Sequence, residues 1–430
     1  MKVFWLIFSL LVGFAVHAHA EDLPLLALTS KHGINFAFLQ SDLQDTVAIS
    51  IAFRGGMASD DVNGPATAYL APGLMTAGAG GKTSSELYEA FQDVGGSFSL
   101  SSNTDQTYAE LSAPSKGIVG AASLANLVLT HPDFPERKLL QRREALAERV
   151  DENNAYPETA MQKAFNMAVA EPHAYQNYFS PTAESVRRVT LADLRPWVAK
   201  HITRDRVLVA VVGNLDPDKM RDIVDILLDG LPEKSDLPDT PRMVFKPAPL
   251  APIRIAFETG DQAILNFGMA QNFRAEIKQW VAASMLSQIF TGDQKSRLFK
   301  DIRESAGATY GLQPNLAFYD AMLVNGVTGR IDKSKVDETV ALVAKSWTKF
   351  REDGPTDEEI ANARANMRQM IGNVSRDHAR LSSFIRDYMT GHWSAEDIGK
   401  IPMMLEEIDL KDKAMLKDLF PANPIIVIAQ

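Results

Sequence analysis

A proline-rich segment divides this chain into two halves that repeat the same order of predicted elements. Between Pro232 and Pro252 the sequence PEKSDLPDTPRMVFKPAPLAP holds six of the chain's 22 prolines. It has no helical period, which is typical of a linker. The likeness between the halves is one of pattern, since few residues are identical. A chain built in this way is constrained to fold as two similar domains joined by an extended connection.

Each half carries the same three kinds of segment. An apolar strand comes first, a long charged amphipathic helix follows, and a helix, a short loop and an apolar strand come near the end. Strands and helices are mixed throughout, and strands often follow one another in hairpin order. The sequence therefore predicts an α+β fold of two homologous domains, each a mostly antiparallel sheet covered by helices. The corresponding segments are 47–53 and 263–273, 136–154 and 357–375, and 191–213 and 410–430.

Capping residues and apolar spacing define several helices. Thr356 followed three residues later by Glu359 predicts a capping box at the start of the second charged helix. The pair Asp216 and Pro217 predicts the start of another helix. A single apolar face is expected for the helix that bears Val336, Val340, Val343, Trp347 and Phe350.

The first 20 residues have the features of a secretory signal peptide. Lys2 precedes an apolar run, and Ala18-His19-Ala20 has the form of a cleavage site. The run is short for a membrane span of about 20 residues, although a single membrane anchor is the alternative. We therefore expect a signal peptide at 1–20, an N-terminal domain at 21–231, a Pro-rich linker at 232–252 and a C-terminal domain at 253–430. The expected location is the periplasm, with secretion to the medium as the alternative.

Composition narrows the class of protein further. The chain has no cysteine, so an exported form must rely on its core rather than on disulfides. The formal net charge is -10, which argues against binding to nucleic acid or to an anionic membrane face.

Known catalytic constellations are largely missing from the sequence. Only six histidines follow the signal peptide, and no two stand three to five residues apart, so a helix-borne zinc pair is not predicted. The stretch from Gly64 to Gly78, GPATAYLAPGLMTAG, is typical of an apolar helix, yet it contains Pro72 and nothing ionisable. No G-x-S-x-G elbow or phosphate-binding G-x-x-x-x-G-K-[ST] loop is present.

One segment of the second half carries a more specific pattern. In QKSRLFKDIRESAGATYGLQP (Gln294 to Pro314), Leu298 and Ile302 form an apolar pair on a helix that Gly307 would terminate. Arg303 would lie on the last helical turn and Tyr310 on the strand that returns beside it. On the residues alone, Arg303 is a solvated helix residue and Tyr310 a half-buried strand aromatic.

The order of elements and these two segments resemble the pitrilysin or insulinase family of zinc peptidases, particularly its short bacterial chains and the mitochondrial processing peptidase subunits. The resemblance covers essentially the whole mature chain. In that family the first domain carries H-x-x-E-H, in which two histidines hold zinc, the glutamate is the general base, and a distal glutamate completes the ligand set.

The resemblance implies that this zinc motif is degenerate here. Gly64, Tyr69 and Leu70 match the frame of the motif, while its catalytic positions fall on Ala68, Ala71 and Pro72. Pro72 would also distort a helix there. The distal glutamate position falls on Arg149, with Glu148 one residue away. The resemblance therefore predicts no metal in this chain.

The second domain keeps the family's other signature. The family string S-R-L-F-x-x-L-R-x-x-x-x-G-x-x-Y is matched by Ser296 to Phe299, Arg303, Gly307 and Tyr310. The resemblance implies that Arg303 and Tyr310 contact the peptide carbonyl and stabilise the tetrahedral oxyanion. A departure is that the glycine-rich loop of the noncatalytic processing-peptidase subunit is replaced by the short 291–295 stretch, so that loop's substrate role is not implied.

Two functions from different classes fit this pattern. The first is the zinc-free subunit of an exported heterodimeric metallopeptidase, which supplies Arg303 and Tyr310 to a homologous partner bearing H-x-x-E-H and zinc, and acts on peptides or unfolded polypeptides. The second is a noncatalytic structural or peptide-binding homologue, comparable to the core subunits of the respiratory bc1 complex. An enzyme that acts alone by another chemistry is disfavoured because no other constellation is present.

Overall fold

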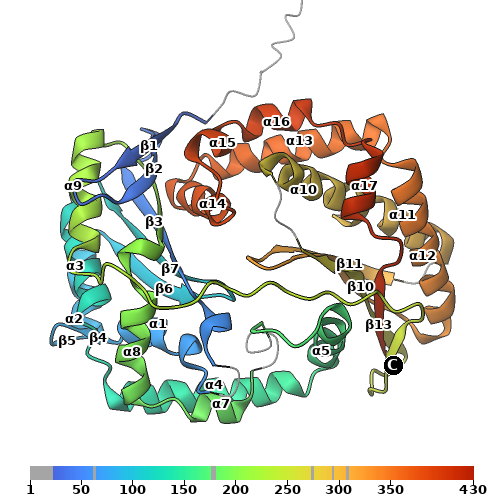
Figure 1. The fold of residues 1–430 in the computed structure, drawn as a ribbon, viewed down its shortest axis with the longest axis horizontal. Helices are drawn as coiled ribbons and strands as arrows, with labels where there is room; N and C mark the ends of the chain where they lie inside the picture. The colour runs from blue at the N-terminus through green and yellow to red at the C-terminus, as the bar shows by residue number, and fades with distance from the viewer. Residues whose placement is uncertain (1–22, 62–63, 176–180, 273–275, 293–294, 307–308) are drawn as a thin grey trace, which may run out of the picture.

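The computed structural model describes residues 23–430 apart from 62–63, 176–180, 273–275, 293–294 and 307–308. The described side chains also leave out those of residues 206 and 303–311. The expected signal peptide at 1–20 thus lies outside the described residues. Two sheets stand in the middle of the molecule, one in each half, and helices surround them (Figure 1). The two-domain α+β architecture predicted from the sequence is confirmed.

The first half is built from short strands and helices that alternate along the chain. Its strands are β1 (Leu25–Thr29), β2 (Asn35–Gln40), β3 (Thr46–Arg54), β4 (Gly78–Ala79), β5 (Lys82–Thr83), β6 (Ser97–Ser102), β7 (Gln106–Pro114) and β8 (Val207–Gly213). Its α-helices are α1 (Ala71–Met75), α2 (Ser84–Asp93), α3 (Ile118–Thr130), α4 (Glu136–Asn154), α5 (Pro157–Val169), α7 (Ala183–Arg187), α8 (Leu191–His201) and α9 (Pro217–Leu228). Its 3-10 turns are η1 (Met57–Ser59), η2 (Thr67–Tyr69) and η3 (Arg204–Arg206).

The second half repeats this plan with longer helices. Its strands are β9 (Ile253–Ile255), β10 (Gln262–Gln271), β11 (Thr309–Phe318), β12 (Leu323–Asp332) and β13 (Ile425–Ala429). Its helices are α10 (Ile277–Thr291), α11 (Arg297–Ala306), the 3-10 turn η4 (Lys333–Lys335), α12 (Val336–Asp353), α13 (Asp357–Val374), α14 (His378–Thr390), α15 (Ala395–Gly399), α16 (Ile401–Glu407) and α17 (Lys413–Leu419).

The local signals read from the sequence reappear in these elements. The Thr356 hydroxyl accepts a hydrogen bond from the Glu359 N–H, and the Glu359 carboxylate accepts one from the Thr356 N–H, which is the predicted capping box of α13. The Asp216 carboxylate caps α9, whose first residue is Pro217. In α12 the predicted apolar face is turned inward, and Trp347 is only 1% exposed. These short-range patterns depend on neighbouring residues alone, so they could be read directly.

The two sheets have matching strand orders. The first sheet runs β1-β2-β8-β3-β7-β6, and the second runs β11-β12-β10-β13-β9. Most neighbours are antiparallel, while β2 with β8 and β13 with β9 are parallel. The central strand β3 is buried over Val47–Phe53, where every residue except Ser50 is apolar. Strands β6 and β11 therefore form the corresponding edges of the two sheets.

The halves exchange one helix each across their boundary. Helix α14 belongs to the second half but packs on β3, β8 and β7 of the first sheet, where Leu381 and Ile385 join Ala37 and Val212 in a small apolar cluster. Helix α5 belongs to the first half but packs on β13 and β10 of the second sheet. In Figure 1, α14 lies beside the first sheet and α5 beside the second. The apolar core of each half is thus completed by the other half.

Polar contacts reinforce this exchange. The Arg386 side chain of α14 is 6% exposed, donates to the Ser50 hydroxyl at 2.8 Å and is paired with Glu110. Its guanidinium also lies 4.1 Å from the centre of the Tyr108 ring. Burying an arginine lowers the stability of the fold unless its N–H groups find acceptors. Ser50 and Glu110 of the first sheet provide such acceptors, so this contact fixes α14 against that sheet.

The tips of two equivalent hairpins also meet between the halves. The β6–β7 turn carries Asp105 and the β11–β12 turn carries Asp320, whose backbone N–H donates to the Asp105 carboxylate at 3.1 Å. The Tyr175 hydroxyl donates to Asp105 at 2.8 Å and accepts from the Ala321 N–H at 2.9 Å. Gln106 donates to Asp320 at 3.2 Å. Corresponding turns of the two repeats thus form a polar contact between the domains.

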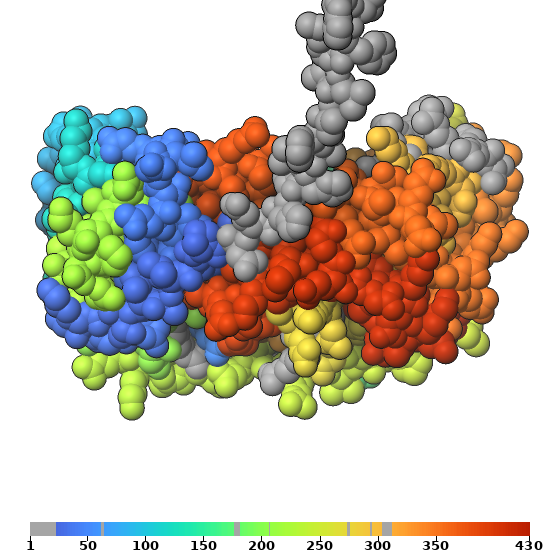
Figure 2. Space-filling view, turned by 90° about the horizontal axis from the view of Figure 1, so that it is seen from above, coloured from blue at the N-terminus to red at the C-terminus, as the bar shows by residue number. Residues whose placement is uncertain are grey.

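The packed halves form one continuous body. Figure 2 shows residues of the second half, in orange and red, pressed against the blue residues of the first half. Helix α15 contacts β1 at this junction. Between α9 and β9 the proline-rich segment runs across the molecule and pairs briefly with residue 170 through Phe245. No helix within the described ranges is both long and apolar enough to cross a membrane.

Candidate functional site

The segment in which the resemblance predicts a degenerate zinc motif forms two short elements and not one helix. Ala68 lies in η2, and Ala71 and Pro72 open the five-residue helix α1. Leu70 stands between them and its carbonyl accepts the first hydrogen bond of α1, from Leu74, at 3.0 Å. Pro72 is the second residue of α1. An N–H at that position has no acceptor within the helix, so a proline there removes no helical hydrogen bond. The proline therefore begins a helix here and interrupts none.

Burial gives the chemical character of this segment. Ala68 is 1% exposed and Ala71 is 0% exposed, and both belong to the apolar core of the first half. Pro72 is buried as well. Small apolar side chains pack at each position where the motif would carry a ligand or a base. The segment thus serves as core in this chain.

Because Pro72 lies in the first turn of α1, replacing it should lower the stability of the protein and not raise it. Pro72→Ala should lower the free energy of unfolding by about 1 kcal/mol, because alanine frees the unfolded chain and loses buried contacts. A proline that interrupted a helix would behave oppositely, and its removal would stabilise by about 3 kcal/mol. Urea unfolding followed by circular dichroism measures the difference. Pro157→Ala, in the first turn of α5, is the matched control and should show a loss of the same sign.

An acidic residue holds the start of this segment in place. The Asp60 carboxylate accepts a hydrogen bond from the Ala68 N–H at 2.8 Å. Burial raises the pKa of Asp60 to about 7, although the backbone N–H groups of Ala68 and Thr67 favour its charged form. Asp60 lies eight residues before Ala68 and beyond a turn, so no sequence spacing pointed to it. This half-buried carboxylate beside Ala68 therefore acts as a backbone cap.

Helix α4 places a guanidinium beside the vacant motif. Gly73 of α1 lies so close to the Arg142 side chain that an added methyl group would collide with the Arg142 guanidinium. Arg149, the position expected for the distal ligand, lies on the same helix seven residues later and is exposed, as is Glu148. Within the described part of the chain, no group of three or more His, Cys, Asp or Glu side chains could hold a metal ion.

The Arg/Tyr signature lies in the other half. Arg303 is in α11 and Tyr310 is in β11, and these two elements contact each other. Their side chains lie outside the described residues, so their orientation remains a prediction. Leu298 and Ile302 of α11 are 0% exposed, which confirms the predicted apolar pair. Helix α1 packs on β6 and α8, whereas α11 packs on α10 and α12, so the vacant motif and the signature occupy separate domains.

A hollow of about 340 Å³ lies between the two halves and the linker. Arg54 of β3 lines it and contacts His392 of the second half and Asp239 of the linker. The charges around the hollow are mixed, since Asp205 also lines it. This mixture gives the hollow no clear preference for a cation or an anion, so it is a weaker candidate site.

Two matched helix-covered sheets make up the chain. Within the described residues the first domain has buried apolar side chains at Ala68, Ala71 and Pro72, and the second domain carries the Arg/Tyr string in its sequence. The model described as "Insulinase (Peptidase family M16)" matches residues 36–181, and the model described as "Peptidase M16 inactive domain" matches residues 188–367. Together these matches cover most of the sequence. The chain belongs to the insulinase family, peptidase family M16.

Individual relatives agree with this assignment. The uncharacterized zinc protease YmxG of Bacillus subtilis is 20% identical over 345 residues, which are 79% of this chain and 82% of that protein. A peptidase M16 inactive domain from Pseudomonas fluorescens has a TM-score of 0.85 at 20% identity, covering 95% of this chain and 98% of its own. The periplasmic protease PqqL from Escherichia coli has a TM-score of 0.81 at 15% identity, covering 94% of this chain and 45% of PqqL. These structural likenesses establish the shared fold.

Proposed function

We propose that this chain is the zinc-free subunit of a periplasmic heterodimeric metallopeptidase. A homologous partner would supply H-x-x-E-H, the bound zinc and the general base. This chain would supply Arg303 and Tyr310 to stabilise the oxyanion that forms when the peptide carbonyl is attacked. The resulting reaction is hydrolysis of a peptide bond in a peptide or an unfolded polypeptide.

The observation that carries this proposal is the division of features between the two domains. The vacant motif is packed as core, since Ala68 and Ala71 are almost fully buried, while the Arg/Tyr string is complete in the sequence. A complete Arg/Tyr string beside apolar residues at the zinc positions is what a subunit that works with a zinc-bearing partner requires. The match to the family's inactive-domain model also supports a subunit that acts with a partner.

Peptide binding has a physical basis in the sheet edges. Strand β6 ends the first sheet and β11 ends the second, so each offers backbone groups along one side. A peptide in extended form can add to such an edge by main-chain hydrogen bonds, which suits sequence-tolerant recognition. Location in the periplasm is supported by the predicted signal peptide and by the periplasmic relative PqqL.

Reconstitution tests the proposal. The purified chain should hydrolyse no quenched-fluorescence peptide alone, and adding it to a zinc-bearing paralogue from the same genome should raise the rate of the paralogue by at least tenfold. The increase should saturate at equimolar subunits and vanish when zinc is chelated. Binding of this chain to the paralogue without any gain in hydrolysis would instead favour the structural role.

A further inference from the structure

Helix α4 carries three cations on one side, with one carboxylate, Glu152, a single turn beyond the last of them. Lys138, Arg142 and Arg149 stand at i, i+4 and i+11, which places them on one side of the helix. All three side chains are exposed. Within the described part of the chain, none of them forms an ion pair or donates to another side chain. We refer to these three residues as the α4 basic flank.

Several charged residues on the other sides of α4 have partners within the protein. Glu144 and Asp151 lie on the opposite flank and pair with Arg187 of α7, at 2.9 and 3.5 Å. Arg143 donates to the Val189 carbonyl at 2.9 Å. Intramolecular partners therefore hold the α7 side of α4. Among the described residues the basic flank has no such partners, although the net charge of the protein is -10.

The position of the basic flank gives it a possible ligand. Arg142 lies against Gly73 of α1, and α1 in turn packs on the edge strand β6. A peptide that adds to β6 would pass α1 and come within reach of long arginine and lysine side chains. The flank spans about 16 Å along the helix, the length of about five residues of extended chain. Acidic side chains on alternate residues of such a peptide could meet two or three of the cations.

We propose that the α4 basic flank selects acidic peptides by contacting their carboxylates while the peptide is paired with β6. This inference rests on the peptide binding put forward under the proposed function, and it adds the substrate class. Guanidinium groups bind carboxylates in a bidentate manner, which gives orientation as well as attraction.

Peptide binding measured without hydrolysis tests this directly. Three fluorescein-labelled peptides of equal length, with Glu, Gln or Lys on alternate positions, are titrated with the chain and followed by anisotropy. We expect the Glu peptide to bind at least tenfold more tightly than the Gln peptide at low salt. The advantage should shrink as salt is raised, since these contacts are exposed. Equal binding of the Glu and Gln peptides would overturn the inference.

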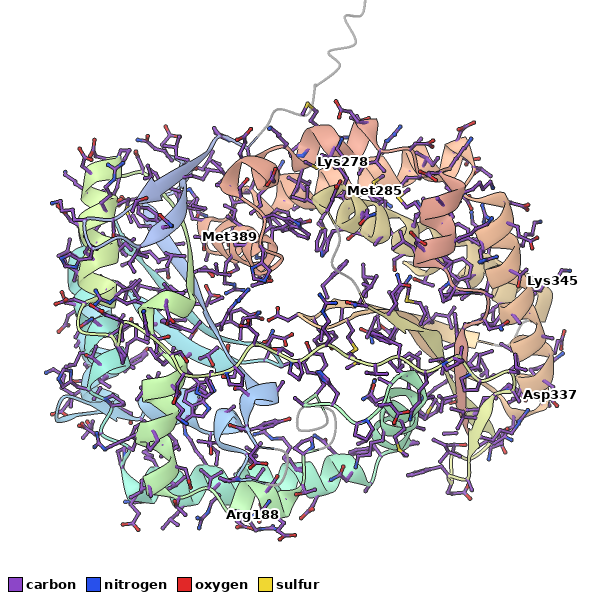
Figure 3. The ribbon with its side chains drawn as sticks, in the orientation of Figure 1. Arg188, Lys278, Met285, Asp337, Lys345 and Met389 are labelled. Carbon is purple, nitrogen blue, oxygen red and sulfur yellow. The ribbon has the colours of Figure 1, made fainter. Side chains whose placement is uncertain are left out.

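Charge-neutralised variants locate the effect. The variant Lys138→Gln, Arg142→Gln, Arg149→Gln should lose the tenfold preference and keep its affinity for the Gln peptide, which also reports that it is folded. The matched control is Lys278→Gln, Lys345→Gln, Lys349→Gln, which removes the same charge from exposed lysines of α10 and α12. Figure 3 shows Lys278 and Lys345 on the second half, away from α4. The control should keep the preference.

The outcomes separate this inference from the proposed function. If the control loses as much preference as the α4 variant, general electrostatics explains the binding and the inference is wrong. If the α4 variant keeps its preference for Glu peptides but no longer binds the zinc-bearing paralogue, the flank is a partner contact and the inference is again wrong. If no peptide of any charge binds, peptide recognition by the proposed subunit fails as well.

Discussion

Replacing Arg303 with alanine should lower kcat/KM of the reconstituted peptidase by about 10² to 10³, while the association of the two subunits stays unchanged. A guanidinium that meets the developing oxyanion acts most strongly in the transition state, and removing one such donor costs a factor of this size. Tyr310→Phe removes one hydroxyl donor and should cost about tenfold to 10²-fold. Both effects should appear mainly in kcat, because the contact strengthens as the carbonyl becomes tetrahedral.

A neighbouring cation on the same helix provides the control. Lys300 lies three residues before Arg303 in α11 and is exposed. Lys300→Ala removes the same formal charge and should leave kcat/KM within about twofold. Circular dichroism and co-elution with the zinc-bearing subunit show that each variant folds and assembles. If Arg303→Ala and Lys300→Ala reduce activity equally, or neither does, Arg303 has no role at the reacting carbonyl.

The duplicated fold could be predicted because its signals are local. A short run of mostly apolar residues predicted the strand at β3, the Thr356 cap predicted the start of α13, and Asp216 with Pro217 predicted the start of α9. Each signal depends on residues within one element. The similar order of these elements on both sides of the proline-rich segment then pointed to two similar domains.

The exchange of helices could not be predicted in the same way. The apolar face of α14 shows that Leu381 and Ile385 must be buried, but it carries no information about which sheet buries them. The structure places them on the first sheet, and the buried Arg386 then pairs with Glu110 there. Arg386 and Glu110 are 276 residues apart in the sequence. A pair so distant produces no periodic pattern from which one sequence could predict it.

Only part of the structure around the expected zinc motif could be predicted from the sequence. The resemblance assigned Ala68, Ala71 and Pro72 to the degenerate motif, which stays a prediction, and the sequence pattern treated their stretch as one helix with a proline inside it. The structure corrects this reading, because the chain forms η2 first and begins α1 only at Ala71. Asp60 and Arg142 contact this segment from a preceding loop and from α4, and neither stands at a spacing that links it to the motif.

The contact between the hairpin tips should make the stability of the protein depend on pH. The Asp105 side chain is 5% exposed, and burial, together with the charge of Asp320, raises the pKa of Asp105 to about 7. In the unfolded chain the pKa of an aspartate is about 3.9. Between these values the folded state holds a proton that the unfolded state has lost. The stabilisation from Asp105 is therefore present below about pH 4 and is lost as the pH rises to about 7.

Substitution by asparagine isolates this contribution. The amide side chain introduced by Asp105→Asn stays neutral at every pH and can still accept the Tyr175 hydrogen bond. The free energy of unfolding of the wild-type chain should therefore fall relative to that of Asp105→Asn by up to about 4 kcal/mol between about pH 4 and pH 7, since each pH unit is worth about 1.4 kcal/mol. Urea unfolding at half-unit pH steps measures the difference, and the contribution of Asp60 cancels because both proteins contain it.

Two further variants test whether the proton that controls stability is bound by Asp105 at the contact between the two halves. Asp320→Asn removes the neighbouring negative charge, so the folded-state pKa of Asp105 should fall. The loss of stability should still begin near pH 4 but end at lower pH and be smaller in total. Asp93→Asn changes an exposed aspartate at the end of α2 and should leave the wild-type profile unchanged. If the profiles of the wild type and Asp105→Asn run parallel, Asp105 is charged in the folded protein at neutral pH. The two hairpin tips would then hold together against the repulsion of two carboxylates, and their contact would depend on the hydrogen bonds donated by Tyr175, Gln106 and the Asp320 N–H.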